Sequence, residues 1–164
     1  QVYLFIDTIF DNIYSLDVRI GEMESTASSE RRNLTREPNE RKRHGHRSDM
    51  LFKCFQGGIG CTEVGKKDVG DSGTKEQKEL GLKVPKMLKD QMWKLVHVYP
   101  DHRCTLVTAR LVMMGLKLRT IVLDNLSTYI YCIYKTEPCY FPATIETFAR
   151  DFGMLLGITS QIKQ

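Results

Sequence analysis

Residues 117–131, KLRTIVLDNLSTYIY, constrain the possible folds of this chain more than any other stretch. The apolar run at 121–123 does not alternate with polar residues, which is typical of a strand buried on both faces, as in a parallel sheet. Asp124 closes the run, and α/β folds place ligand-binding groups at the carboxyl ends of such strands. Asp124 is therefore a candidate ligand-binding carboxylate, and the alternative is that it caps a following helix.

The chain has 164 residues, enough for one domain with a substantial core, and its hydrophobic content of 41% indicates a globular protein. Cys54 and Cys61 have no histidine at zinc-ligand spacing after them, so the five cysteines predict free thiols in a reducing compartment. No apolar run is long enough to span a membrane, and we expect no membrane contact. Because the chain starts at Gln1 on an apolar run, we expect a segment to be missing upstream.

Two interpretations fit the first 24 residues. In the favoured one, residues 2–7 form a buried strand and residues 9–24 an amphipathic helix that packs on the sheet. In the other, apolar residues at alternating spacings of about four and three form the seam of a coiled coil. The seam consists of Val2, Ile6, Ile9, Ile13, Leu16, Ile20 and Met23.

Residues 25–49 contain almost no apolar side chain and predict a solvated loop with clustered positive charge. A flexible basic loop can follow a phosphate backbone through Coulomb attraction and counterion release. Its basic residues form two clusters, at 31–32 and at 41–43. These clusters are also similar to a bipartite nuclear-import signal, which predicts a nuclear protein. The candidate DNA-binding residues of this loop are Arg31, Arg32, Arg41, Lys42, Arg43 and Arg47.

The next stretch, residues 50–82, is rich in glycine and is expected to continue the loop as one flexible insertion over 25–82. Residues 60–67 nearly match a phosphate-binding loop, but lysine stands where the motif needs a hydroxyl for magnesium, and no helix pattern follows. We interpret the match as a coincidence. Lys66 and Lys67 remain candidates for the DNA-binding surface.

Order is expected to return at Val84, with strands and helices in alternation. A helix opens at Pro85, a strand covers 94–99, a helix covers 102–114 and a strand covers 119–124. A further helix starts at Pro142 and ends at Gly153, before a last strand over 154–159. This order predicts an α/β fold with a mostly parallel sheet flanked by helices.

Three segments then resemble the core of RecA-type recombinases and their eukaryotic paralogues. They are VYLFIDT at 2–8, RTIVLDNLSTY at 119–129 and FARDFGMLLGITSQI at 148–162. The resemblance implies a single RecA-like domain over 1–164, a Walker B-like Asp124 and a sensor-like Gln161. The combination around Asp124 is most similar to the diverged paralogues of the Shu complex. Such proteins help to load recombinase filaments in homologous recombination.

The chain departs from that family in two places. The phosphate-loop strand and helix would have to precede residue 1, and Ile9 occupies the position of the catalytic carboxylate. Without a general base or a phosphate cradle, we do not expect this chain to hydrolyse ATP alone. ATP and magnesium would bind only with a missing segment or a partner, and Asp124 and Gln161 are then the candidate contacts.

The favoured function is therefore an assembly factor for recombinational DNA repair. It would bind single-stranded or forked DNA independently of sequence and form a heterodimer with recombinase or paralogue subunits. The alternatives are an ATPase of the same family that lacks its phosphate loop here, and a coiled-coil oligomeric scaffold of the viral polymerase cofactor type.

Overall fold

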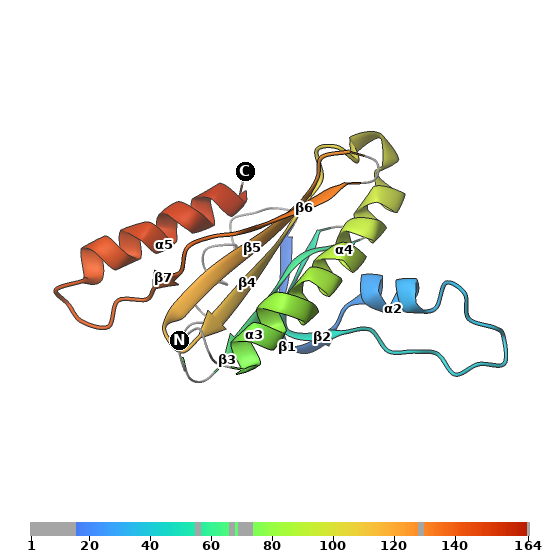
Figure 1. Cartoon of the computed structure of the whole chain (residues 1–164), viewed down its shortest axis with the longest axis horizontal. Coiled ribbons are helices and arrows are strands. Elements are labelled where there is room, and N and C mark those ends of the chain that lie inside the picture. Colours follow the sequence, from blue (N-terminus) through green and yellow to red (C-terminus); the bar gives the residue numbers. More distant parts are fainter. Residues whose placement is uncertain (1–15, 55–56, 66–67, 69–73, 128–129, 164) are drawn as a thin grey trace.

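The structure is a computed structural model that describes residues 16–54, 57–65, 68, 74–127 and 130–163. Strands and helices are mixed along the chain (Figure 1). The strands are β1 (Leu16–Glu24), β2 (Arg47–Cys54), β3 (Gly57–Gly65), β4 (Val107–Met114), β5 (Lys117–Asn125), β6 (Tyr131–Lys135) and β7 (Cys139–Tyr140). The helices are α2 (Thr26–Arg32), α3 (Thr74–Lys78), α4 (Val84–Val98) and α5 (Phe148–Lys163), with a π-helical turn at Glu79–Lys83 and a 3-10 turn at Pro100–His102.

The described strands form one seven-stranded sheet in the order β1-β2-β3-β4-β5-β6, with β7 pairing to β5 beside β6. The fold is α/β, as predicted, but the sheet is mostly antiparallel, and only the β3–β4 pairing is parallel among the described strands. The tight turn at Gly115, whose φ is +61°, explains part of this difference. It joins β4 directly to β5, and so short a connection can link only antiparallel neighbours.

The sheet is covered by helices on both faces. On one face, α4 places Leu88 and Met92 against Val112 and Ile121 of the central strands. On the other face, Leu155 of α5 packs with a cluster that comes from four strands. Successive residues of a strand point to opposite faces, so β4 supplies both clusters in alternation. The second cluster consists of Met50, Phe52, Leu111, Met113, Leu118 and Cys139.

The predicted helix opening at Pro85 and the predicted strand at 119–124 are confirmed as α4 and β5. Two predictions between them are wrong. Residues 94–98, expected in a strand, continue α4 because Leu95 extends the buried face of Leu88 and Met92. Residues 107–114, expected in a helix, form β4, where pairing to β3 and β5 outweighs the helical spacing.

Both ends of the chain also differ from expectation. The favoured helix over 9–24 is wrong for its second half, because residues 16–24 form β1. The last positions of the coiled-coil seam lie on this strand, and residues 1–15, including the expected strand at 2–7, lie outside the described residues. At the other end, α5 runs through Gly153 and replaces the expected strand at 154–159.

The stretch 25–82, expected as a flexible insertion, contains α2, β2, β3 and α3. β2 and β3 lie within the sheet, with β3 paired to β4. Gly60 shows why glycine recurs here: a Cβ at this position would lie 2.6 Å from the carbonyl oxygen of Ala109 on β4. The near phosphate-loop match starts inside β3, and Lys66 and Lys67 lie outside the described residues. Cys61, Cys104, Cys132 and Cys139 are free thiols in the structure, and burial raises the pKa of the Cys61 thiol to about 11.

An ion cluster lies between the sheet and the helical layer. Arg110 of β4 is completely buried, and its Nη2 donates to Glu63 Oε1 of β3 at 2.7 Å. Its Nη1 lies 2.9 Å from the Met87 sulfur of α4. Lys83 contacts Glu63 at 3.1 Å and Glu79 at 3.3 Å. Burial raises the pKa of Glu63, although Arg110 and Lys83 favour its charged form.

We expect Arg110→Leu to lower the free energy of unfolding by about 3–5 kcal/mol, because it leaves buried carboxylates without their main partner. Urea unfolding measures the change. A matched control is Arg19→Ala, which breaks a half-exposed ion pair to Asp17 and should cost less than about 1 kcal/mol. Replacing Arg110 and Glu63 together by leucine should recover part of the loss. A loss in Arg110→Leu no larger than that of the control would contradict a structural role for the cluster.

Candidate nucleic-acid interface

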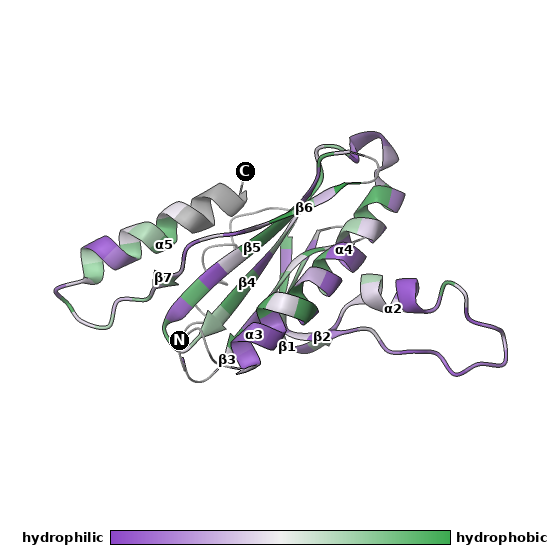
Figure 2. Ribbon diagram, in the orientation of Figure 1, coloured by the Kyte–Doolittle hydropathy of each residue, from purple (hydrophilic) through white to green (hydrophobic). Residues whose placement is uncertain are grey.

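Residues 31–47 carry the strongest charge of the described chain. They contain seven basic and two acidic residues, a formal charge of +5, which exceeds the +4 of the whole chain. We call residues 34–46, which join α2 to β2, the basic arm. Figure 1 shows the arm projecting away from the sheet, and Figure 2 shows that it is hydrophilic over most of its length. Concentrated positive charge on a projecting segment favours binding to a polyanion.

The arm leaves the fold through α2, a short helix with a well-defined start. Ser25 is in the extended conformation before the first turn, and its hydroxyl accepts from the Ser28 amide at 3.3 Å. The helix is held against α4 by two ion pairs. Arg31 contacts Asp90 at 2.6 Å, and Lys94 contacts Glu30 at 2.6 Å. These contacts fix the starting point of the arm relative to the sheet.

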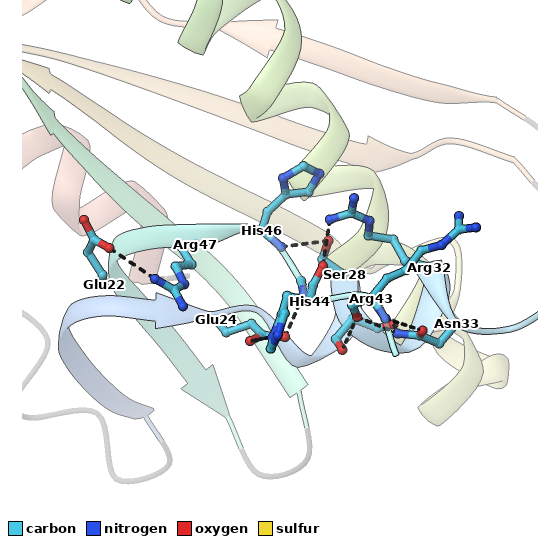
Figure 3. A network of polar contacts seen from close by, with 11 residues as sticks. Glu22, Glu24, Ser28, Arg32, Asn33, Arg43, His44, His46 and Arg47 are labelled. Carbon is cyan, nitrogen blue, oxygen red and sulfur yellow. Dashed lines mark hydrogen bonds and ion pairs between the residues drawn. The ribbon is translucent and has the colours of Figure 1, made fainter. Parts of the chain in front are cut away.

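The two ends of the arm are joined by hydrogen bonds (Figure 3). The Arg43 amide donates to Asn33 Oδ1 at 2.8 Å, and Asn33 Nδ2 donates back to the Arg43 carbonyl at 2.7 Å. Glu24 accepts from the Gly45 amide at 2.6 Å and contacts His44 at 3.1 Å, and these bonds lower the pKa of Glu24. Together they close the arm into a loop.

Gly45 is the closest contact at this base. A Cβ there would lie 2.3 Å from the Ser25 carbonyl oxygen and 2.9 Å from the Ser29 amide. Only glycine lets the returning chain pass this close to the first turn of α2. The base of the arm is therefore set by backbone packing as well as by hydrogen bonds.

The returning limb of the arm presents free positive charge. Arg41, Lys42 and Arg43 are exposed, and their side chains have no ion-pair partner in the described part of the chain. Arg36 is used differently, because its guanidinium donates to main-chain carbonyls of Glu37, Pro38 and Glu40 within the arm. The arm thus organises its own tip and leaves three consecutive cations for a ligand.

The other residues predicted for DNA binding fall into different environments. Arg31 is half-buried in its ion pair with Asp90, and Arg47 lies 3.6 Å from Glu22 on the exposed β1–β2 surface. Arg32 donates to the His44 carbonyl at 2.7 Å and keeps its charge, because that acceptor is neutral. Lys66 and Lys67 lie outside the described residues.

His46 marks the contact between the arm and α4. Its backbone amide donates to Ser28 Oγ at 3.2 Å, and its ring points towards α4 in Figure 3. Its Nε2 is buried with no hydrogen-bond partner in the described structure. Burial lowers the pKa of His46, and the charges of Arg32 and Lys86 lower it further, while Asp90 acts in the opposite direction. Arg32 and Lys86 are therefore close enough to act on the same ring.

Two lysines of α4 near the base of the arm were not among the residues predicted from the sequence to bind DNA. Lys86 and Lys89 are exposed on the helix that α2 packs against, and Lys86 acts electrostatically on His46 at the arm's base. The sequence signal for this surface is the helical spacing of Lys86 and Lys89. The expected strand at 94–99 divided α4, so its exposed face was not recognised as one surface.

Asp124 and Gln161, the candidate nucleotide-binding residues, lie on β5 and on α5, and not at the ends of two parallel strands as the resemblance implies. Asp124 is half-buried near the end of β5, directly opposite Cys132 of β6. A hydrogen bond with Cys132 and the negative charge of Asp124 raise the pKa of Tyr134. Because both neighbours of β5 are antiparallel to it, their carboxyl ends do not meet beside Asp124. Gln161 lies in α5, where the resemblance expects a strand end.

Within the described residues, no group of histidine, cysteine and acidic side chains could hold a metal ion. A helix long and apolar enough to cross a membrane is likewise absent from that part of the chain. No protein-family model, curated protein or solved structure matches this chain. The evidence for the candidate interface is therefore its geometry and its charge.

We expect His46 to make the protein less stable in mild acid. Because its pKa is lower in the folded state, the unfolded chain binds the proton more tightly, and stability falls as pH drops below about 6.5. The test is urea unfolding of the wild type and of His46→Gln on both sides of this pH. The variant should lose less stability than the wild type on acidification. Equal losses would show that His46 does not sense the charges around it.

Proposed function

We propose that this protein binds nucleic acid through its phosphate backbone, with the basic arm as the main contact, and acts as a binding subunit of a nucleoprotein assembly. The observation that carries the proposal is the run Arg41, Lys42 and Arg43, which is exposed and lacks ion-pair partners among the described residues. Unpaired cations release condensed counterions when they meet phosphates, and this release drives binding that is independent of sequence.

The construction of the arm supports this function over a merely solvated loop. Its ends are joined by the Asn33–Arg43 hydrogen bonds and by the close passage of Gly45. Fixing the base reduces the chain entropy that is lost when the charges meet a ligand. Lys86 of α4 acts on His46 at the base of the arm, and Lys89 is exposed one turn further along the same rigid helix.

The cellular setting stays a prediction from the resemblance. A role in homologous recombination and DNA repair, nuclear location and a heterodimer with recombinase or paralogue subunits all belong to that prediction. A RecA-like core receives no support from the strand pairing, which is mostly antiparallel. We therefore propose DNA binding on the evidence of the arm and do not rest it on the recombinase family.

A protein partner has a separate observation in its favour. β6 lies at an edge of the described sheet and exposes Ile133, Tyr134 and Tyr131. An edge strand with apolar side chains is a typical place for another chain to bind. This surface lies on β6 and is separate from the arm. It supports the idea of a subunit that contacts nucleic acid and protein at once.

The test of the proposed function is fluorescence anisotropy of a labelled single-stranded oligonucleotide, titrated with the protein at several salt concentrations. We expect the variant with Arg41, Lys42 and Arg43 changed to alanine to bind more weakly. The slope of log affinity against log salt should be smaller by roughly two to three, since each phosphate contact contributes about 0.7–0.9.

A matched control removes the same number of charges elsewhere. Lys78, Lys135 and Arg150 are exposed on α3, β6 and α5, and their replacement by alanine should leave the salt slope nearly unchanged. Equal weakening in both triple variants would mean that net charge, and not the arm, is responsible. Absence of binding by the wild type at low salt would refute the proposed function.

A further inference from the structure

The exposed face of α4 carries an aromatic side chain within a basic row. Lys86, Lys89, Trp93 and His97 are spaced by three, four and four residues, so the helical period places them on one face. Lys86, Lys89 and His97 are exposed, and Trp93 is partly exposed. The opposite face of α4 is buried against the sheet, and Figure 2 shows that the helix carries both apolar and hydrophilic residues.

Trp93 is held in place without being part of the hydrophobic core. Its ring centroid lies 4.4 Å from that of His97, with an angle of 45° between the planes. The ring Nδ1 of His97 lies 2.8 Å from the Trp93 carbonyl oxygen, which fixes the histidine beside the indole. Trp93 belongs to none of the core clusters formed by the described residues. A large aromatic side chain kept at the surface in one orientation is suited to contact with a ligand.

The charges around Trp93 favour an anionic ligand. Lys86 lies on the same face and is close enough to His46 to act on its pKa together with Arg32. The acidic groups of the facing helices, Asp90 and Glu30, are both occupied in ion pairs with Arg31 and Lys94. The positive surface of the arm thus continues along α4 towards the indole.

We propose that Trp93 is a stacking platform for an unpaired base, and that the ligand of the interface is a single-stranded nucleic acid. The strand's phosphates would contact the basic arm, Lys86 and Lys89, while one base lies on the indole. In a duplex the faces of the bases are covered by their neighbours, so stacking on Trp93 is open only to a single strand. This inference rests on the proposed function and adds the class of nucleic acid and the residue that selects it.

The single tryptophan of the chain makes the test direct. Oligothymidylate or oligouridylate should quench the intrinsic fluorescence of the wild type, whereas a hairpin duplex with the same number of nucleotides should not. Trp93→Leu should weaken binding of the single strand by about 5- to 140-fold and leave duplex binding unchanged, since stacking contributes about 1–3 kcal/mol per base. Trp93→Phe, which keeps an aromatic face, should stay close to the wild type.

The control is Tyr140→Leu, which removes an exposed aromatic side chain on β7, away from α4, and should not change the affinity. Strong weakening in the arm variant, with the wild-type affinity in a folded Trp93→Leu, would refute the stacking platform and leave the proposed function intact. Equal quenching by the hairpin would also refute it. If Trp93→Leu fails to fold, the quenching of the wild type decides the question alone.

Discussion

The structure depends on the ion pairs that surround one buried arginine. Arg110 lies on a central strand with no access to solvent, and its ion pair with Glu63 crosses the β3–β4 pairing, the one parallel pairing described in the sheet. Met87 and Lys83 bring the start of α4 to the same cluster. A second buried pair, Lys117 with Glu76 at 2.8 Å, joins β5 to α3. Because a buried charge is costly without its partner, these contacts strongly favour one placement of the helical layer on the sheet.

That placement explains the candidate interface. The same helix that packs on Arg110 presents Asp90 and Lys94 to α2, and α2 in turn fixes the start of the basic arm. The arm projects from the fold, but its base has a defined position relative to α4. Arg32 at the end of α2 and Lys86 on α4, far apart in sequence, therefore act on the same His46 ring at the base of the arm. The binding role that we propose follows from this arrangement of packing and charge.

The sequence predicted local features better than pairing. The buried run at 119–124 and the apolar face after Pro85 are unambiguous, and both elements were found. The apolar residues of 107–114, Leu111 and Val112 among them, fit a helix as well as a strand, and only pairing with β3 and β5 decides between the two. β3 is not evident from the sequence because its glycines are typical of a loop, whereas Gly60 allows close approach of β4. β2 begins within the polar, basic stretch that precedes it, which is also typical of a loop. The basic cluster was visible in the sequence, but its continuation onto Lys86 and Lys89 required the full length of α4.

Gly45 also bears on how this protein can change over generations. The backbone at Gly45 passes close to Ser25 and Ser29, and the Arg43 amide donates to Asn33, so residues 34–42 form a loop that is closed at its base. A closed loop tolerates insertions well, since each doubling of its length costs only about 0.6 kcal/mol. Residues 34–42 can therefore gain, lose or exchange charges with little effect on folding, while the residues at the base cannot. The fold thus carries a replaceable segment whose composition can be tuned to a new polyanion.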